Sequence, residues 1–336
     1  MEQQNTTPEP RPLPAFARNI RNPFILAALR GDNHFLVFKY IGGALIILGA
    51  FLMGQIPASL AIMAGAMMKG EKVTDLPDSA LQSAYGLDKN LFLFLAILSF
   101  VIGILGIWVV VKFLHRRTFL SLVTPSAKLN WKKIGVAFAI YFVLSGAVEY
   151  IAYLQDPGNY ALQFNVPRFV VLFLVTVLFM PFQTSFEELF FRGYLMQGFG
   201  LLFRSGIPAM VLTSVLFALM HGGNPEVGKF GFWTMFPFYC GFGLMLGFIT
   251  LMDKSLEIPL AVHAANNMFG SLFITFEGSA LQTDAVFMQK QMNPSEMMPF
   301  YFGSMFLFLL VCSFVFGWWK KKPEAPAEAA RDFDNG

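Results

Sequence analysis

Eight long apolar runs divide the sequence, and they constrain the fold more than any other feature. A hydrocarbon core of about 30 Å takes around 20 helical residues to cross. Hydrophobic residues make up 56% of the chain and charged residues only 13%, against roughly 45–50% and about 25% in soluble domains. We therefore predict an all-α, polytopic membrane protein with about eight transmembrane helices around a buried polar cavity. The runs cover 40–67, 91–113, 135–154, 168–203, 207–221, 230–252, 258–276 and 299–319.

The remaining composition argues against several classes of protein. The net charge of +3 is too small to indicate a nucleic-acid partner, and no basic patch interleaved with aromatic residues is present. Cys240 and Cys312 both fall inside apolar runs, so a disulfide framework is not expected. Residues 1–33 are polar and Pro-rich and contain no apolar core, so a cleavable signal peptide is not expected either.

Lysine and arginine residues are distributed unevenly between the two sides that alternating spans define. With a cytoplasmic N-terminus, most of the 24 Lys and Arg residues fall on the cytoplasmic side, as the positive-inside rule requires. The bias predicts a multi-pass membrane protein with both termini in the cytoplasm. The opposite side keeps Lys69, Lys72, Lys89, Arg168, Lys229 and Lys290.

A group of charges, Glu187-Glu188-x-x-x-Arg192, interrupts the longest apolar run. Ionisable groups below the membrane surface are costly, usually face a bundle interior or a wet cavity, and mark functional sites by default. Glu188 and Arg192 are four residues apart and can pair on one helix face, whereas Glu187 points about 100° away. Glu187 is therefore our candidate general base, with a structural bond to a backbone group as the alternative. Glu188 and Arg192 are candidate supporting residues.

Pro181 leaves a second interpretation of this run open. The stretch 168–203 is too long for one simple span, and a proline breaks or kinks a helix near the residue before it. If a new helix begins near Ser185, the sequence Ser-Phe-Glu-Glu at 185–188 forms a capping box. Glu188 would then serve only to satisfy the backbone at a helix start.

Two later runs carry polar groups at a similar depth. Glu187 and His221 lie about 27 and 24 Å from the predicted cytoplasmic turn between their helices, at about 1.5 Å per residue. His263 and Asn267 lie about 14 and 20 Å beyond the next cytoplasmic turn. These two are four residues apart and can point at one atom, as the donors of an oxyanion site must. We expect all four side chains to line one cavity. Asn266 is expected to be a packing contact between helices. The alternative for His221 is a buried core residue whose hydrogen bonds are satisfied within the fold.

Several other classes of membrane protease have characteristic sequence motifs that this chain lacks. It contains no His-Glu-x-x-His zinc motif and no serine in a Gly-x-Ser-x-Gly elbow. A pair of intramembrane aspartates is also absent, since Gly-Phe-Gly at 241–243 is followed by Leu244. Neither cysteine has electropositive neighbours that would make it a nucleophile.

The sequence implies no cofactor, although one set of residues leaves a metal site as an alternative. Glu187, His221 and His263 have the composition of a zinc site with two histidines and one glutamate. The neutral Asn267 and the charged pair next to Glu187 suit a polarised water better. We therefore favour chemistry without a metal.

Three motifs, taken in order along the chain, carry a family resemblance. Together they resemble the CAAX protease and bacteriocin-processing family of intramembrane glutamate proteases, over about residues 184–269. Some members of that family act on CAAX proteins and others are linked to bacteriocin immunity. The motifs are Glu187-Glu188-x-x-x-Arg192, Phe217-x-x-x-His221 and His263-x-x-x-Asn267.

The resemblance implies a role for each motif residue. Glu187 would be the general base that activates a water, with His221 assisting it. His263 and Asn267 would stabilise the oxyanion, and the other two charged residues of the first motif would support them. The active cavity would open to the cytoplasm.

These observations together predict a membrane-embedded endopeptidase of the glutamate type, with the lipid bilayer and a membrane-associated peptide or protein substrate as its partners. The alternatives are a non-catalytic membrane scaffold or bacteriocin-immunity protein, a zinc-dependent membrane protease and a proton-coupled transporter. We divide the chain into a polar cytoplasmic segment (1–35), two transmembrane helices with their loops (36–134), a catalytic membrane core like that of the family (135–319) and a cytoplasmic tail (320–336).

Overall fold

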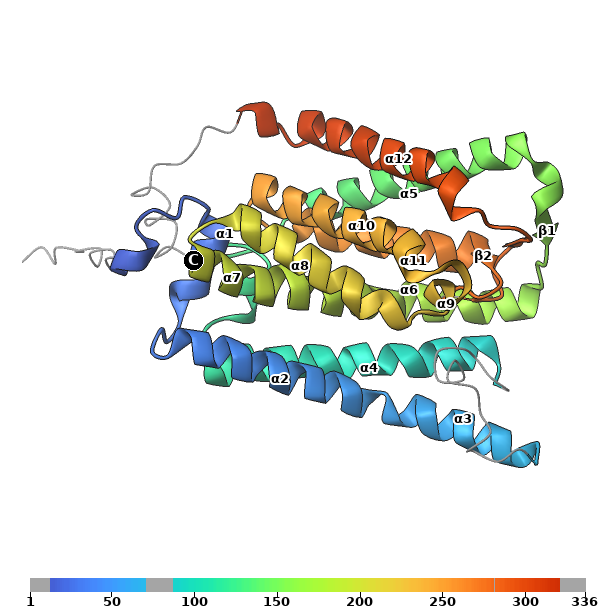
Figure 1. Cartoon of the computed structure of the whole chain (residues 1–336), viewed down its shortest axis with the longest axis horizontal. Coiled ribbons are helices and arrows are strands. Elements are labelled where there is room, and N and C mark those ends of the chain that lie inside the picture. The colour runs from blue at the N-terminus through green and yellow to red at the C-terminus, as the bar shows by residue number, and fades with distance from the viewer. Residues whose placement is uncertain (1–12, 71–86, 281, 321–336) are drawn as a thin grey trace, which may run out of the picture.

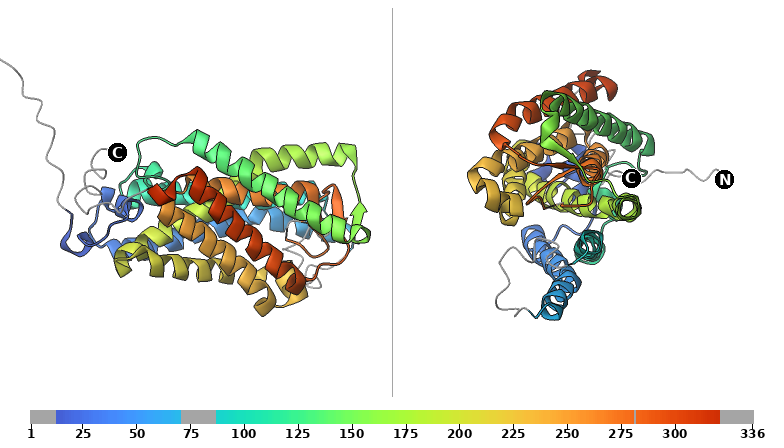
Figure 2. Two further views of the ribbon diagram at one scale, coloured as in Figure 1. Left: turned by 90° about the horizontal axis from the view of Figure 1, so that it is seen from above. Right: turned by 90° about the vertical axis from the view of Figure 1, so that its right-hand side faces the viewer.

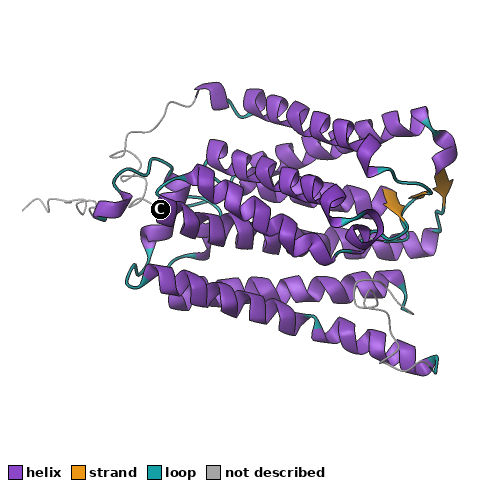
Figure 3. Cartoon of the chain, viewed as in Figure 1, coloured by secondary structure: helices purple, strands orange, loops and turns teal. Residues whose placement is uncertain are grey.

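The computed structural model describes residues 13–70, 87–280 and 282–320. Within these ranges helices dominate, and three short strands lie at one end (Figures 1 and 3). The predicted all-α polytopic class is confirmed, because seven described helical segments are long and apolar enough to cross a membrane. Beyond Lys320 the predicted tail lies outside the described residues. The seven segments are Leu36–Met68, Lys89–Leu114, Trp131–Gln155, Val166–Phe203, Gly206–Gly223, Phe232–Asp253 and Pro294–Val315.

The eighth predicted run, 258–276, forms the central helix of the bundle. Helix α11 covers Glu257–Phe273, only 17 residues, and the end of the predicted run forms strand β2 (Ile274–Phe276). Most side chains of α11 are buried, because it packs between α5 (Trp131–Gln155) and α6 (Val166–Glu188). Because its neighbours shield α11 from lipid, this helix does not need a continuous apolar surface. It can therefore carry polar side chains that face the interior of the bundle.

The first two spans form a pair beside the main bundle. Helices α2 (Leu36–Gly54) and α3 (Ile56–Met68) make up the first span. They are separated at Gln55 because Pro57, in the first turn of α3, has no N–H to donate to the preceding turn. Helix α4 (Lys89–Val109) packs along α2 and also contacts α6. Seen end-on, the pair lies to one side of the other helices (Figure 2).

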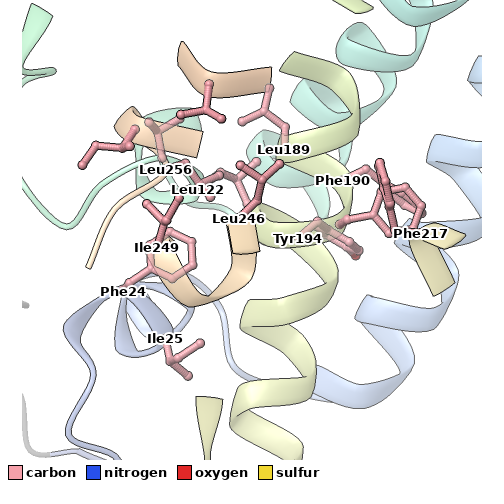
Figure 4. Close-up of a cluster of buried hydrophobic side chains, with 14 of the residues drawn as sticks. Phe24, Ile25, Leu122, Leu189, Phe190, Tyr194, Phe217, Leu246, Ile249 and Leu256 are labelled. Carbon is pink, nitrogen blue, oxygen red and sulfur yellow. The ribbon is translucent and has the colours of Figure 1, made fainter. Parts of the chain in front are cut away.

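Part of the N-terminal segment is buried, which its polar composition did not predict. Helix α1 (Pro23–Leu26) is buried along its whole length and packs against α7 (Met196–Phe203). The side chains of Phe24, Ile25 and Leu26 belong to an apolar cluster, and Figure 4 labels Phe24 and Ile25 within it. The Gln197 amide on α7 donates to the carbonyl of Phe24 at 3.0 Å. The segment is therefore anchored to the helix that continues from Glu187.

The main bundle contains α5 to α12 and carries a small sheet at one end. Strand β3 (Phe287–Gln289) pairs antiparallel with β1 (Tyr160–Leu162) and parallel with β2. The sheet lies at the end of the molecule opposite α1 and Trp318–Lys320 (Figure 1). The remaining helices are α8 (Gly206–Met220), α9 (Pro225–Phe230), α10 (Phe232–Asp253) and α12 (Pro294–Val315).

Helix α6 runs through Pro181 without ending. It continues as a π-helical segment, Leu189–Leu195, and then as α7, so that Val166–Phe203 is one helical stretch of 38 residues. Membrane helices tolerate an interior proline where neighbouring groups satisfy the freed backbone. Because no helix begins at Ser185, the capping-box interpretation of Glu188 is wrong.

His115 lies in a buried polar cluster between the first pair of spans and the π-helical segment. Its side chain is 1% exposed, and its Nε2 atom lies 2.9 Å from the hydroxyl of Tyr194. That hydroxyl donates to the carbonyl of Lys39, so Nε2 donates to Tyr194 and Nδ1 carries no proton. Among the described residues Nδ1 has no partner. Burial, followed by the charges of Arg117 and Lys39, lowers the pKa of His115 to about 3.

We expect acid to destabilise the protein through His115. The unfolded imidazole takes up a proton below about pH 6.5, whereas the folded protein resists protonation down to about pH 3. The contribution of His115 to the free energy of unfolding is therefore fully present above pH 6.5. It is lost as the pH falls, by about 2 kcal/mol at about pH 5. Thermal unfolding in detergent at about pH 7.5 and about pH 5 should show a smaller acid-induced drop in Tm for His115→Gln than for the native chain.

His34 provides the control for this measurement, because its side chain is exposed. His34→Gln should keep the native drop in Tm between the two pH values. An equal acid-induced drop in Tm for the native chain and for His115→Gln would contradict the assignment of this acid sensitivity to His115.

Candidate active site

The predicted site residues come from three helices that meet inside the main bundle. Glu187 and Glu188 are the last two residues of α6, His221 follows the last residue of α8, and His263 and Asn267 lie on α11. The π-helical segment begins directly after the two glutamates, and such segments often occur at functional sites. The structure thus brings together side chains that are far apart in the sequence.

The Glu188 carboxylate lies between a guanidinium and an imidazole. Its Oε1 atom accepts a hydrogen bond from Arg192 Nη1 at 2.9 Å and lies 2.7 Å from His263 Nδ1. The side chains of Glu188 and Arg192 are both 0% exposed. The pairing expected from their spacing is present, and burial this complete leaves each charge dependent on its partner.

Two neighbours accommodate the Arg192 guanidinium. A Cβ atom added to Gly243 on α10 would lie 3.1 Å from Arg192 Nη2 and 3.0 Å from the Cα of Ser214, so glycine is needed for this close approach. The Phe217 ring on α8 lies 4.4 Å from the guanidinium carbon, in a cation–π geometry. The same ring lies 4.3 Å from the ring of His221. Phe217 therefore supports both the charged pair and the histidine.

Glu187 is held by one carboxylate oxygen, while the other faces two histidines. Its Oε1 atom accepts a hydrogen bond from the Gln183 amide at 2.5 Å. Its Oε2 atom is buried and has no hydrogen-bond partner in the described part of the chain. This oxygen lies 3.5 Å from His263 Nε2 and 3.9 Å from His221 Nε2. Such separations suit groups that share a water better than groups that bond directly.

The hydrogen-bond partners of the two histidines indicate which ring nitrogens carry protons. His221 Nδ1 lies 2.7 Å from the carbonyl of Phe217, and His263 Nδ1 faces the carboxylate of Glu188. Both partners are acceptors, so we assign a proton to each Nδ1. In the neutral imidazoles both Nε2 atoms are then acceptors, and they converge with Glu187 Oε2. A water molecule has two O–H donors and can satisfy two of these three acceptors.

Asn267 joins the cluster through Gln183. Its amide donates to Gln183 Oε1 at 2.8 Å, and its own oxygen accepts from Asn266 at 3.0 Å. Asn266 in turn accepts a hydrogen bond from the Tyr141 hydroxyl on α5 at 3.3 Å, a contact between helices of the kind expected for it. Gln183 was not predicted, although its spacing of four residues from Glu187 is a signal that could have identified it.

A second polar network behind His221 was also not predicted. The Tyr239 ring on α10 lies 4.5 Å from the ring of His221, and its hydroxyl donates to Glu226 at 2.5 Å. The Asn224 amide donates to the same hydroxyl at 3.1 Å. Glu226 is 8% exposed and also accepts from the backbone N–H of Ala280 at 2.8 Å. The network holds the loop after α8 and thereby positions His221.

Among the described residues, no three His, Cys, Asp or Glu side chains are arranged to hold a metal ion. Cys240 and Cys312 are free thiols on α10 and α12. The residues as they stand offer a carboxylate, two imidazoles and two amides.

The apolar helix bundle and its enclosed polar cluster define an integral membrane protein with a buried site. Residues 166–269, which contain all six predicted site residues, match the profile of the family described as type II CAAX prenyl endopeptidase Rce1-like. The chain is also 34% identical over 259 residues to the uncharacterized protein YyaK of Bacillus subtilis (strain 168), a match that covers 77% of this chain and 84% of that protein. No solved structure matches the chain.

The chain therefore belongs to the Rce1-like family of CAAX proteases, and the resemblance carried by its three motifs is confirmed. Membership supports a CAAX-protease-like membrane endopeptidase. The YyaK relative adds no activity of its own, because it is itself uncharacterized.

We expect Arg192→Met to destabilise the protein, because it leaves the Glu188 carboxylate buried without its cation. Removing one partner of a buried pair costs about 3–5 kcal/mol, so the unfolding midpoint in detergent should fall clearly. The double variant Glu188→Gln/Arg192→Met should recover part of the loss, since it removes both charges. Arg204→Met, at an exposed position just after α7, is the matched control. Equal losses in the single and double variants would contradict the pairing argument.

Proposed function

We propose that the protein is an intramembrane endopeptidase that hydrolyses a peptide bond in a membrane-associated peptide or protein. One observation carries this proposal: Glu187 Oε2 is buried, is not hydrogen-bonded within the described residues, and faces Nε2 of both His221 and His263. A carboxylate held by its other oxygen and directed at two imidazoles is arranged to receive a proton. The membership of the Rce1-like family supports the same reaction class.

The proposed reaction begins with a water that shares its two protons with this cluster. Glu187 accepts one proton as the water oxygen attacks the carbonyl carbon of the scissile bond. The C=O double bond opens to an oxyanion, and His221 assists by accepting from the same water. The tetrahedral intermediate then collapses, the C–N bond breaks, and the leaving amine takes up the proton held by Glu187.

Oxyanion stabilisation is assigned to His263 and Asn267. One N–H of the Asn267 amide is used by Gln183, which leaves the second N–H as a donor. His263 donates through Nε2 in its imidazolium form, which takes its second proton from solvent before the reaction and keeps it throughout. Its Nδ1 partner, Glu188, stabilises that imidazolium, while the charge of Glu188 is itself balanced by Arg192. In this scheme Glu188 and Arg192 act by positioning His263.

The same proposal assigns an orientation and a division of the chain. The excess of Lys and Arg residues on one side puts both termini in the cytoplasm. Residues 135–319 form the catalytic membrane core, residues 36–134 add the first pair of spans, and the segments 1–35 and 320–336 lie on the cytoplasmic side.

We expect Glu187→Gln to abolish peptide cleavage while leaving the fold intact. The glutamine side chain keeps the shape of glutamate but cannot accept a proton from the attacking water. Loss of a general base lowers the rate by about 10²–10⁴-fold. The assay is cleavage of a library of membrane peptides by purified full-length protein in detergent. Glu277→Gln, an exposed position outside the cluster, should cleave at the native rate.

Two outcomes of this assay would overturn the proposal. Cleavage that survives Glu187→Gln would remove the proposed base. Activity that is lost on metal chelation and restored by zinc would replace the metal-free mechanism with a zinc-dependent one.

A further inference from the structure

A cavity of about 510 Å³ lies between α5, α11 and α12 and reaches the small sheet. This volume falls in the range of ligand pockets, about 300–1,000 Å³. Apolar side chains such as Phe269 and Phe300 line it together with polar ones such as Tyr141 and Asn266. The lining does not include Glu187, so the cavity is adjacent to the candidate catalytic cluster and distinct from it.

The charged residues that line this cavity are all acidic. Glu149, Asp156 and Glu296 belong to the lining, whereas no lysine, arginine or histidine does. None of these three carboxylates forms an ion pair with another described residue. Asp156 and Glu296 are exposed and Glu149 is half-buried. A cation that enters the cavity therefore meets three carboxylates, while Lys290, whose Nζ donates to the carbonyl of Gly158, is outside the lining.

Glu149 lies deepest of the three in a membrane-spanning segment, because Asp156 follows the end of α5 and Glu296 is in the first turn of α12. It precedes the end of α5 at Gln155 by about 9 Å of helix. Its Oε1 atom accepts a hydrogen bond from the Tyr160 hydroxyl at 2.8 Å. Burial and then this carboxylate raise the pKa of Tyr160, so the phenol remains a neutral donor. An intramembrane carboxylate without a cation marks a functional site by default.

A chain of hydrogen bonds links the wall of the cavity to the candidate base. Tyr141 and Asn266 line the cavity, and the Tyr141 hydroxyl donates to Asn266. Asn266 donates to Asn267, Asn267 donates to Gln183, and Gln183 donates to Glu187. A group bound in the cavity is therefore only a few side chains away from the reacting atoms.

We propose, resting on the peptidase function proposed above, that this cavity is the subsite that receives a basic side chain of the membrane-associated substrate. Its apolar walls suit the methylene stem of an arginine or lysine, and Glu149 accepts the charged head. Tyr141 and Glu149 are separated by about 12 Å along α5, a distance that an extended peptide crosses in about four residues. The part of the cavity between Tyr141 and Glu149 thus has the length of about four substrate residues.

The position of the cavity also indicates the direction from which the substrate arrives. The sheet that the cavity reaches lies at the end of the molecule opposite Trp318–Lys320 (Figure 1). With cytoplasmic termini, the basic residue binds on the non-cytoplasmic side of Glu187. This differs from the cytoplasmic opening that the family resemblance implies.

The test measures binding separately from cleavage. Full-length Glu187→Gln protein in nanodiscs is titrated with fluorescent Leu/Ala membrane peptides that carry a single arginine, moved through successive positions. Citrulline, the neutral analogue of arginine, replaces it in the matched peptides. At the best position the arginine peptide should bind about tenfold tighter than the citrulline peptide. Adding Glu149→Gln should reduce this preference to below about threefold, and Glu149→Lys should reverse it in favour of a glutamate peptide.

Glu277→Gln is the matched control, because it removes a carboxylate at the same end of the molecule but outside the cavity; it should keep the full preference. The absence of a preference at every position, or a preference that survives Glu149→Gln, would overturn the subsite. The cleavage arm uses native Glu187 and the same peptides. Arginine-selective binding without cleavage would overturn the peptidase function and leave the cation subsite standing, whereas cleavage without any arginine preference would overturn the subsite alone.

Discussion

The ion pair between Glu188 and Arg192 is the interaction on which the centre of this bundle depends. Both side chains are fully buried, in a place where a lone charge would be strongly destabilising. Each neighbouring helix contributes something that the pair requires: α10 supplies the space at Gly243, α8 the ring of Phe217, and α11 the imidazole of His263. The packing of three helices is thus adapted to one charged pair, which fixes where His263 lies.

Adjacent positions on α6 separate two tasks that would interfere if one residue performed both. Glu188 faces a cation, which holds its charge in place and makes it suitable for orienting an imidazole. Glu187 is rotated by about 100° and contacts an amide and the Nε2 atoms of two histidines. The rotation between neighbouring residues leaves the Arg192 hydrogen bond to Glu188 and gives Glu187 a different set of partners.

The features of this structure that could be predicted from the sequence are those that depend on local residue spacing. The Glu188–Arg192 pair follows from a separation of four residues, and the membrane spans follow from run length. Matching depth along the helices indicated that His221 and His263 would meet near Glu187. Contacts made across the bundle were beyond such reasoning: Tyr239 reaches His221 from α10. Likewise, the polar composition of the N-terminal segment hid the apolar α1, whose burial depends on a surface of α7 that only the folded bundle presents.

Three of the glutamates in the membrane-spanning segments show why composition alone could not assign their roles. Glu187, Glu188 and Glu149 are equally costly by the hydropathy of their surroundings, yet each has a different partner in the fold. Glu188 meets a guanidinium, Glu187 meets an amide and two imidazoles, and Glu149 meets a phenol and an open cavity. A carboxylate paired with a cation has a structural role, one that faces two imidazoles can share a water with them, and one beside a cavity whose lining contains no cation has room for a cation from outside. The role of each follows from its partner. Gln183 and Arg192 lie on the same helical stretch as the glutamates they contact, whereas the two histidines and Tyr160 come from other elements.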